Sequence, residues 1–151
     1  LQTPPHRLED VGLVAGVRFV NDSKATNPHA AASGVASLPA DEPLVWIGGG
    51  SEKESDFGPI ADIVAARAQA AVLIGATADR LDAALAGRLP VGRAADLPSA
   101  VAQAWQDAGG RGIVLLSPAC ASFDMFSGYA ERGDVFRDAV RALRSAVQAD
   151  S

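Results

Sequence analysis

The stretch Asn21-Asp22-Ser23-Lys24-Ala25-Thr26-Asn27-Pro28 lies between a strand-like apolar run and an alanine-rich, helix-like run that ends at Leu38. Asn27 followed by Pro28 is typical of a helix N-cap with proline at the first helical position. The stretch therefore predicts a turn from a strand into a helix. Free backbone N–H groups and the positive end of the helix dipole favour an anion there, and Lys24 adds a full positive charge.

An ordinary capping turn explains the same residues. Asp22, Ser23 and Thr26 are common turn and cap residues, and Lys24 is then a solvated surface charge. Taken alone, the turn favours this simpler interpretation, because capping turns are far more common than binding sites. The rest of the chain has to decide between the two.

Apolar runs alternate with helical patterns along the whole chain. The predicted strands are 11–14 and 17–21, which form a hairpin around Ala15-Gly16, then 44–47, 70–74 and 113–116, with a short edge strand at 91–93. The predicted helices are 29–38, one from about Pro59, 78–85, 97–108 and 134–147. This alternation predicts an α/β, Rossmann-like fold: a mostly parallel sheet with helices on both faces and an N-terminal hairpin.

Three polar loops follow predicted strands, at residues 22–26, 48–53 and 117–122. Ligands of doubly wound sheets bind beyond the carboxyl ends of the strands, so these loops are expected to converge on one ligand. The glycines at 48–50 let the backbone approach a ligand closely. Lys53 stands where a dinucleotide fingerprint needs a small residue, and no G-x-x-x-x-G-K-[ST] occurs, so the chain has neither an NAD signature nor a P-loop of its own.

Composition narrows the function classes. The 151 residues suit one domain, and the formal charge of -5 argues against binding to nucleic acid. No apolar run approaches the length of a membrane span. Cys120 is the only cysteine, and with only His6 and His29 as possible bases we expect it to be packed rather than nucleophilic. Neither histidine has neighbours at metal-ligand spacing, so no metal site is predicted, and a reducing cytoplasm fits best.

The first residues, Leu1-Gln2-Thr3-Pro4-Pro5, indicate an extended linker. The chain has no initiator methionine and no signal-peptide pattern at this end. We therefore expect it to be part of a larger protein.

Five segments together resemble the C-terminal domain of the Mur ligases, and within that family its D-glutamate-adding members. They are Pro5-His6-Arg7, the residues 20–27, the glycine-rich loop with Lys53-x-x-Asp56-Phe57, the residues 115–124, and Tyr129-x-x-Arg132-Gly133. The Asp-Ser-Lys-Ala-Thr-Asn and Ser-Pro-Ala-Cys-Ala-Ser segments are highly specific as a pair. The resemblance implies a three-domain enzyme, with residues 1–8 as the linker from a central ATPase domain and 9–151 as the C-terminal domain.

The resemblance also implies a reaction. Members of the family are ATP-dependent, amide-forming ligases of peptidoglycan synthesis, and so serve cell wall biogenesis, cell shape and cell division. ATP and Mg²⁺, bound mainly by the central domain, activate the carboxylate of UDP-N-acetylmuramoyl-L-alanine as an acyl phosphate, and the amine of D-glutamate attacks it. A cytoplasmic monomer is implied. The chain alone, which lacks the P-loop, is predicted to be inactive.

Site residues follow from the same resemblance. Arg7 and Asp22 resemble the family's nucleotide contacts, and Lys24 its contact to the transferring phosphate, which makes Lys24 the predicted catalytic residue. The predicted D-glutamate contacts are Thr26, Lys53, Ser122 and the backbone at Tyr129. The chain departs from the commonest pattern at Gly50-Ser51-Glu52, Phe123 and Tyr129. The alternative hypothesis is a non-catalytic α/β module that binds a small anion through the same loops.

Overall fold

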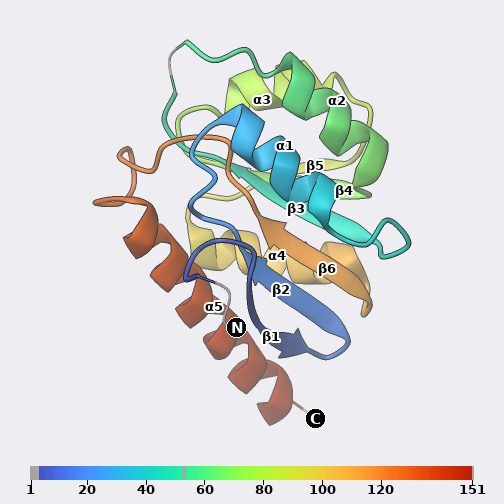
Figure 1. The fold of residues 1–151 in the computed structure, drawn as a ribbon. Helices are drawn as coiled ribbons and strands as arrows, with labels where there is room; N and C mark the ends of the chain where they lie inside the picture. The colour runs from blue at the N-terminus through green and yellow to red at the C-terminus, as the bar shows by residue number, and fades with distance from the viewer. Residues whose placement is uncertain (1–3, 53, 151) are drawn as a thin grey trace.

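A six-stranded sheet with helices on both faces makes up the computed structural model, which describes residues 4–52 and 54–150 (Figure 1). The strands are β1 (Glu9–Val14), β2 (Val17–Asn21), β3 (Leu44–Gly49), β4 (Ala70–Ile74), β5 (Val91–Arg93) and β6 (Gly112–Leu116). Their order across the sheet is β1-β2-β6-β3-β4-β5. Only the β1–β2 pair is antiparallel, so the sheet is mostly parallel, as predicted.

The helices divide between the two faces of the sheet (Figure 1). They are α1 (Pro28–Ser37), α2 (Gly58–Arg67), α3 (Ala78–Leu85), α4 (Leu97–Ala108) and α5 (Tyr129–Ala149). The first three pack together on one face, and α4 and α5 pack on the other. Alternate side chains of β3 point to opposite faces of the sheet, and a hydrophobic core lies on each face. Leu44 and Trp46 pack in the core under α1 to α3, and Val45 packs in the core under α4 and α5.

The predicted elements are confirmed, including the hairpin, the edge strand β5 and the cap of α1. The Asn27 side chain accepts a hydrogen bond from the Ala30 N–H at 2.9 Å, and Pro28 begins the helix. The main difference is α5, which begins at Tyr129 rather than near Asp134. Its first turn lacks apolar periodicity and is instead held by polar contacts of the buried Arg132, as described below.

Candidate functional site

The three predicted loops meet at the carboxyl-terminal edge of the sheet, because β6 lies between β2 and β3. The loop after β6 bonds to both of the others. Its Ala119 N–H donates to the Ala25 carbonyl at 3.0 Å, and its Pro118 carbonyl accepts from Gly49 at 2.9 Å. Ser51 and Ala121 form a further two-way bridge, with N···O distances of 2.8 and 3.0 Å. This edge is therefore one hydrogen-bonded unit.

Asp22 is a buried carboxylate held by both of its oxygens. Oδ1 accepts from the Leu8 N–H at 3.1 Å, and Oδ2 accepts from the Ser117 hydroxyl at 2.8 Å. Burial raises the pKa of Asp22, while the bonds from Ser117 and Leu8 and the positive charge of Arg7 act in the opposite direction. The carboxylate consequently links the β2 loop to the start of β1 and to the end of β6.

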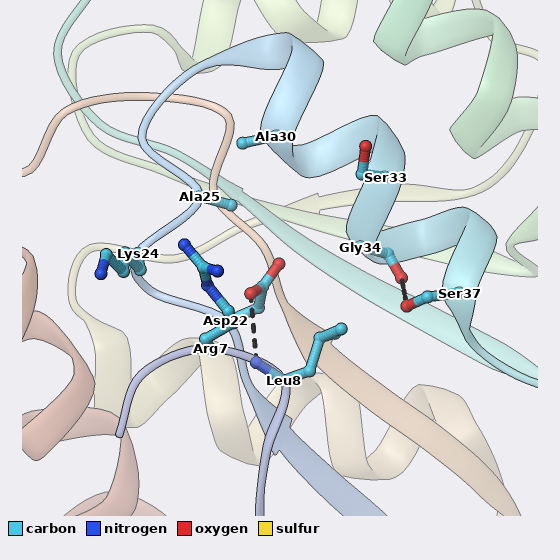
Figure 2. A pocket seen from close by; sticks show the side chains of 9 residues that line it. All are labelled: Arg7, Leu8, Asp22, Lys24, Ala25, Ala30, Ser33, Gly34 and Ser37. Carbon is cyan, nitrogen blue, oxygen red and sulfur yellow. Dashed lines mark hydrogen bonds between the residues drawn. The ribbon is translucent and has the colours of Figure 1, made fainter. Parts of the chain in front are cut away.

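An open cavity of about 370 Å³ is lined by three of the predicted residues, which Figure 2 shows from close by. Arg7, Asp22 and Lys24 line it together with one side of α1, where Gly34 has no side chain to fill the space. The Arg7 guanidinium lies beside the Asp22 carboxylate in this view, and Lys24 lies at the rim. Arg7 and Lys24 are exposed. Two exposed cations beside a cavity at a strand-to-helix turn suit an anionic ligand.

Residues 6–8 pack against the same loop. The Lys24 N–H donates to the His6 carbonyl at 2.9 Å, and the buried His6 ring places Nδ1 3.0 Å from the Asn21 side-chain amide. The His6 ring also meets the Tyr129 ring edge-on, with centroids 6.0 Å apart. Gly133 is required beside it, since a Cβ there would lie 2.0 Å from His6 Nδ1. These contacts fix the segment that carries Arg7.

Two of the predicted amino-acid contacts, Thr26 and Tyr129, lie close to Lys24. The Lys24 ammonium is 6.0 Å from the centroid of the Tyr129 ring, and Thr26 is half-buried two residues further along the loop. Tyr129 is in the first turn of α5, where backbone N–H groups have no intrahelical acceptor. Its carbonyl is occupied by the Ser23 hydroxyl at 2.7 Å.

Ser122 is buried, and its hydroxyl has no hydrogen-bond partner among the residues that the structure describes. A buried hydroxyl without a partner is costly and uncommon in native proteins, so this atom calls for an explanation. Lys53, the other predicted contact, lies outside the described residues. The structure thus gathers Arg7, Asp22 and Lys24 in one cavity and leaves Ser122 buried nearby in the third loop.

Arg132 is a buried residue that holds this edge together and to which the sequence reasoning assigned no role. Its side chain is fully buried, and it donates to the Ser23 hydroxyl at 2.9 Å, to the Ser23 carbonyl at 2.7 Å and to the Cys120 carbonyl at 3.0 Å. Burial lowers the pKa of Arg132 to about 10, which still leaves it charged at neutral pH. One indication of its importance is visible in the sequence: Arg132 is the charged residue in Tyr129-x-x-Arg132-Gly133, one of the segments that carry the resemblance. The resemblance assigned a role only to Tyr129 in that segment.

Cys120 is buried, as expected for a packed cysteine. Its sulfur lies 3.4 Å from Thr77 Oγ1, and burial raises the pKa of the thiol to about 11. A thiol with this pKa carries almost no thiolate at neutral pH, which disfavours a nucleophilic role.

The strand order and the three joined loops define a Rossmann-like α/β domain whose candidate binding site lies at the carboxyl ends of its strands. Residues 6–120 match the model of the Mur ligase, glutamate ligase domain family. The chain therefore belongs to this family.

Curated proteins of similar sequence support the same family assignment. The chain is 46% identical over 143 residues to a UDP-N-acetylmuramoylalanine–D-glutamate ligase of Symbiobacterium thermophilum, covering 91% of this chain and 30% of that protein. It is 44% identical to the ligase of the same name from Nitrosococcus oceani, covering 93% of this chain and 31% of that one. The chain thus spans about three tenths of the length of these relatives.

Solved structures show the same fold at low sequence identity. The MurF ligase of Thermotoga maritima in complex with ADP superposes with a TM-score of 0.59 at 12% identity, over 100% of this chain and 33% of that one. The Mycobacterium tuberculosis folylpolyglutamate synthase complexed with ADP gives 0.63 at 19% identity, over 89% and 32%.

Proposed function

We propose that this chain is the C-terminal, amino-acid-receiving domain of an ATP-dependent ligase that adds D-glutamate to UDP-N-acetylmuramoyl-L-alanine in peptidoglycan synthesis. Relatives with that activity in their names are 43–46% identical over about nine tenths of the chain. In this proposal residues 1–8 link a preceding central ATPase domain to the domain formed by 9–151. The enzyme is a cytoplasmic monomer that binds neither nucleic acid nor membrane.

One observation carries the proposal. The two most specific segments of the sequence, 22–27 and 117–122, are far apart in the chain but are joined at one edge of the sheet by the Asp22–Ser117 and Ala119–Ala25 hydrogen bonds. Arg7 and Lys24 present two cations over the adjoining cavity. A capping turn alone requires neither the second segment nor the cavity, so a ligand-binding role explains more of the structure.

The residues divide into two groups by position. Arg7 and Asp22 contact the nucleotide, and Lys24 supplies fixed positive charge where phosphate charge is shared during transfer. ATP with Mg²⁺, bound mainly by the central domain, would supply the phosphoryl group. Lys24 and Arg7 fit this role because both cations are exposed at the cavity.

The amino acid is assigned to the other side of Lys24. Glutamate carries two carboxylates, so its pocket needs donors at both ends. The Ser122 hydroxyl, the Thr26 hydroxyl and the backbone N–H of Tyr129 are suitable donors, and the buried, unpartnered state of Ser122 Oγ among the described residues supports its role. Lys53 is included as the charged anchor on the family resemblance alone.

The direct test uses the full-length protein with ATP, UDP-N-acetylmuramoyl-L-alanine and D-glutamate. We expect ATP-dependent amide formation with D-glutamate and not with L-glutamate, and no product from residues 1–151 alone. Product formation by the isolated chain would contradict the assignment of the P-loop to another domain. Anion binding without ATP-dependent product formation by the full-length protein would favour the non-catalytic module.

Variants separate the two groups of residues. Lys24→Ala should lower kcat at saturating D-glutamate, because the lost charge acts on the transferring phosphate. Lys53→Ala should instead raise the KM for D-glutamate roughly ten- to hundredfold and leave the KM for ATP unchanged. Arg111→Ala is a matched control, since Arg111 is an exposed cation just before β6, at the opposite edge of the sheet.

A further inference from the structure

The loop after β3 is fixed by a residue that lies outside it, Arg80 in α3. Its Nη1 donates to the Glu52 carbonyl at 2.6 Å, and its Nη2 donates to the Ser55 carbonyl at 2.8 Å. The guanidinium also lies over the ring of the buried Phe57, 4.5 Å from the centroid. One planar cation therefore contacts the middle and the end of this loop at once.

The start of the loop is tied to the same end of α3. The Gly50 N–H donates to Thr77 Oγ1 at 3.1 Å, and the Thr77 N–H donates back to the Gly50 carbonyl at 3.1 Å. Thr77 is buried, and it precedes the first residue of α3. The first turn of α3 and the residue before it thus hold the backbone of this loop at Gly50, Glu52 and Ser55.

This loop leads directly to Ser122, whose hydroxyl has no partner among the described residues. Ser51, next to the carbonyl that Arg80 binds, forms the two-way bridge with Ala121, and Ala121 precedes Ser122. A shift of the Glu52 backbone would therefore be passed through this bridge to the position of the Ser122 hydroxyl. The chain of contacts contains no element of the nucleotide cavity, which is lined by Arg7, Asp22, Lys24 and α1.

We propose that Arg80 is a positioning residue for the amino-acid site of the ligase, acting through the backbone of residues 50–52 and 54–57. The inference rests on the proposed function, because it assigns the Ser122 side of the edge to the amino acid. Arg80 is exposed, and it contacts two backbone carbonyls and the Phe57 ring of this loop, so its role is to orient the loop and not to touch substrate. Lysine can replace the charge but not the two-pronged geometry, because an ammonium lacks the planar fork.

The test is steady-state kinetics of the full-length protein with each substrate varied separately. Arg80→Ala should raise the KM for D-glutamate about five- to twentyfold, with kcat and the KM for ATP within about twofold of wild type. Arg80→Lys should lie between wild type and Arg80→Ala. The KM for D-glutamate staying at the wild-type value in Arg80→Ala would overturn the inference.

Arg88→Ala is the matched control. Arg88 is also exposed and also donates to backbone carbonyls, those of Leu85 and Ala84 at 3.0 and 2.9 Å, but at the far end of α3. It should leave the KM for D-glutamate unchanged. An equal rise in both variants would show a general effect on α3 and would refute a specific role for Arg80.

Hydrogen exchange of the full-length protein gives a second readout that does not depend on turnover. Amides in 50–57 should exchange faster in Arg80→Ala than in wild type and in Arg88→Ala. Unchanged exchange would show that Arg80 does not hold this loop in place. A wild-type protein that makes no product would defeat the proposed function. An active wild-type protein with no change in Arg80→Ala would defeat only this inference.

Discussion

Two buried serines at the same edge of the sheet differ completely in their hydrogen bonding. The Ser23 hydroxyl donates to the Tyr129 carbonyl at 2.7 Å and accepts from Arg132 at 2.9 Å. The Ser122 hydroxyl, equally buried, has no partner among the described residues. A buried hydroxyl stabilises a fold only when it is bonded, so Ser23 belongs to the scaffold, whereas Ser122 is the better candidate for contact with a ligand.

The largest effect is expected at the centre of the Ser23 network. Arg132→Met keeps much of the side-chain volume but leaves the Ser23 and Cys120 carbonyls without their buried donor. Each unsatisfied group costs about 1–3 kcal/mol, so we expect a loss of roughly 2–5 kcal/mol in the free energy of unfolding. Denaturant titration followed by circular dichroism measures this loss.

Arg137→Met is the matched control for that variant, because Arg137 lies on the same helix α5. It pairs with Glu9 and Asp134 at 3.3 and 3.4 Å in a partly exposed setting, where such pairs contribute about 0–1 kcal/mol. Equal losses in the two variants would mean that burial of Arg132 does not set its contribution.

The next effect is expected at Ser23 itself. Ser23→Ala removes an acceptor of Arg132 and the donor to the Tyr129 carbonyl, both buried or partly buried. We expect a loss of about 1–3 kcal/mol in the free energy of unfolding. The same titration measures this loss. If Ser23→Ala lost less free energy of unfolding than a variant of an exposed serine, such as Ser37→Ala, Ser23 would have no structural role.

Sequence reasoning reached the fold because the local patterns agree with it. Alternating apolar runs and the Asn27-Pro28 cap each act within a few residues. Gly109, which ends α4 in the left-handed conformation with φ of 69°, is a local signal of the same kind. The start of α5 was placed too late, near Asp134. Its first turn is stabilised by bonds from Arg132 to partners that no periodicity reveals.

The candidate site was predictable only in part for the same reason. Asp22 and Lys24 stand in a turn whose chemistry is visible locally. The pairing of Ser23 with Arg132 joins residues 109 positions apart, and the burial of Ser122 depends on the packing of three loops. Long-range polar contacts of this kind leave no spacing pattern in a single sequence.

A smaller effect, dependent on pH, is expected at Asp22. Because burial raises the pKa of Asp22 above its unfolded value, ionisation of this group disfavours the folded state. Asp22→Asn should therefore raise the Tm at neutral pH, and the gain should fade as the pH drops through the folded and then the unfolded pKa. Thermal unfolding of both proteins between pH 3 and pH 8 tests this. A Tm difference that grows on acidification would mean that folding lowers the pKa of Asp22 rather than raising it. The variant should still bind ATP more weakly, because under the proposed function the Asp22 carboxylate contacts the nucleotide even though it lowers the stability of the fold.

The smallest effect on stability, and the sharpest test of the comparison, is expected at Ser122. Ser122→Ala removes a buried hydroxyl that bonds to no described group, so the free energy of unfolding should stay within about 0.5 kcal/mol of wild type or rise slightly. If the hydroxyl serves the amino acid, the KM for D-glutamate should rise about two- to tenfold, the value of one neutral hydrogen bond, with the KM for ATP unchanged. Ser23→Ala should show the opposite balance, with a clear loss of stability. A Ser122→Ala variant that is destabilised as much as Ser23→Ala but binds D-glutamate normally would show that both serines belong to the scaffold. Removal of a structural hydroxyl lowers the free energy of unfolding, whereas removal of a substrate-binding hydroxyl raises the KM for D-glutamate.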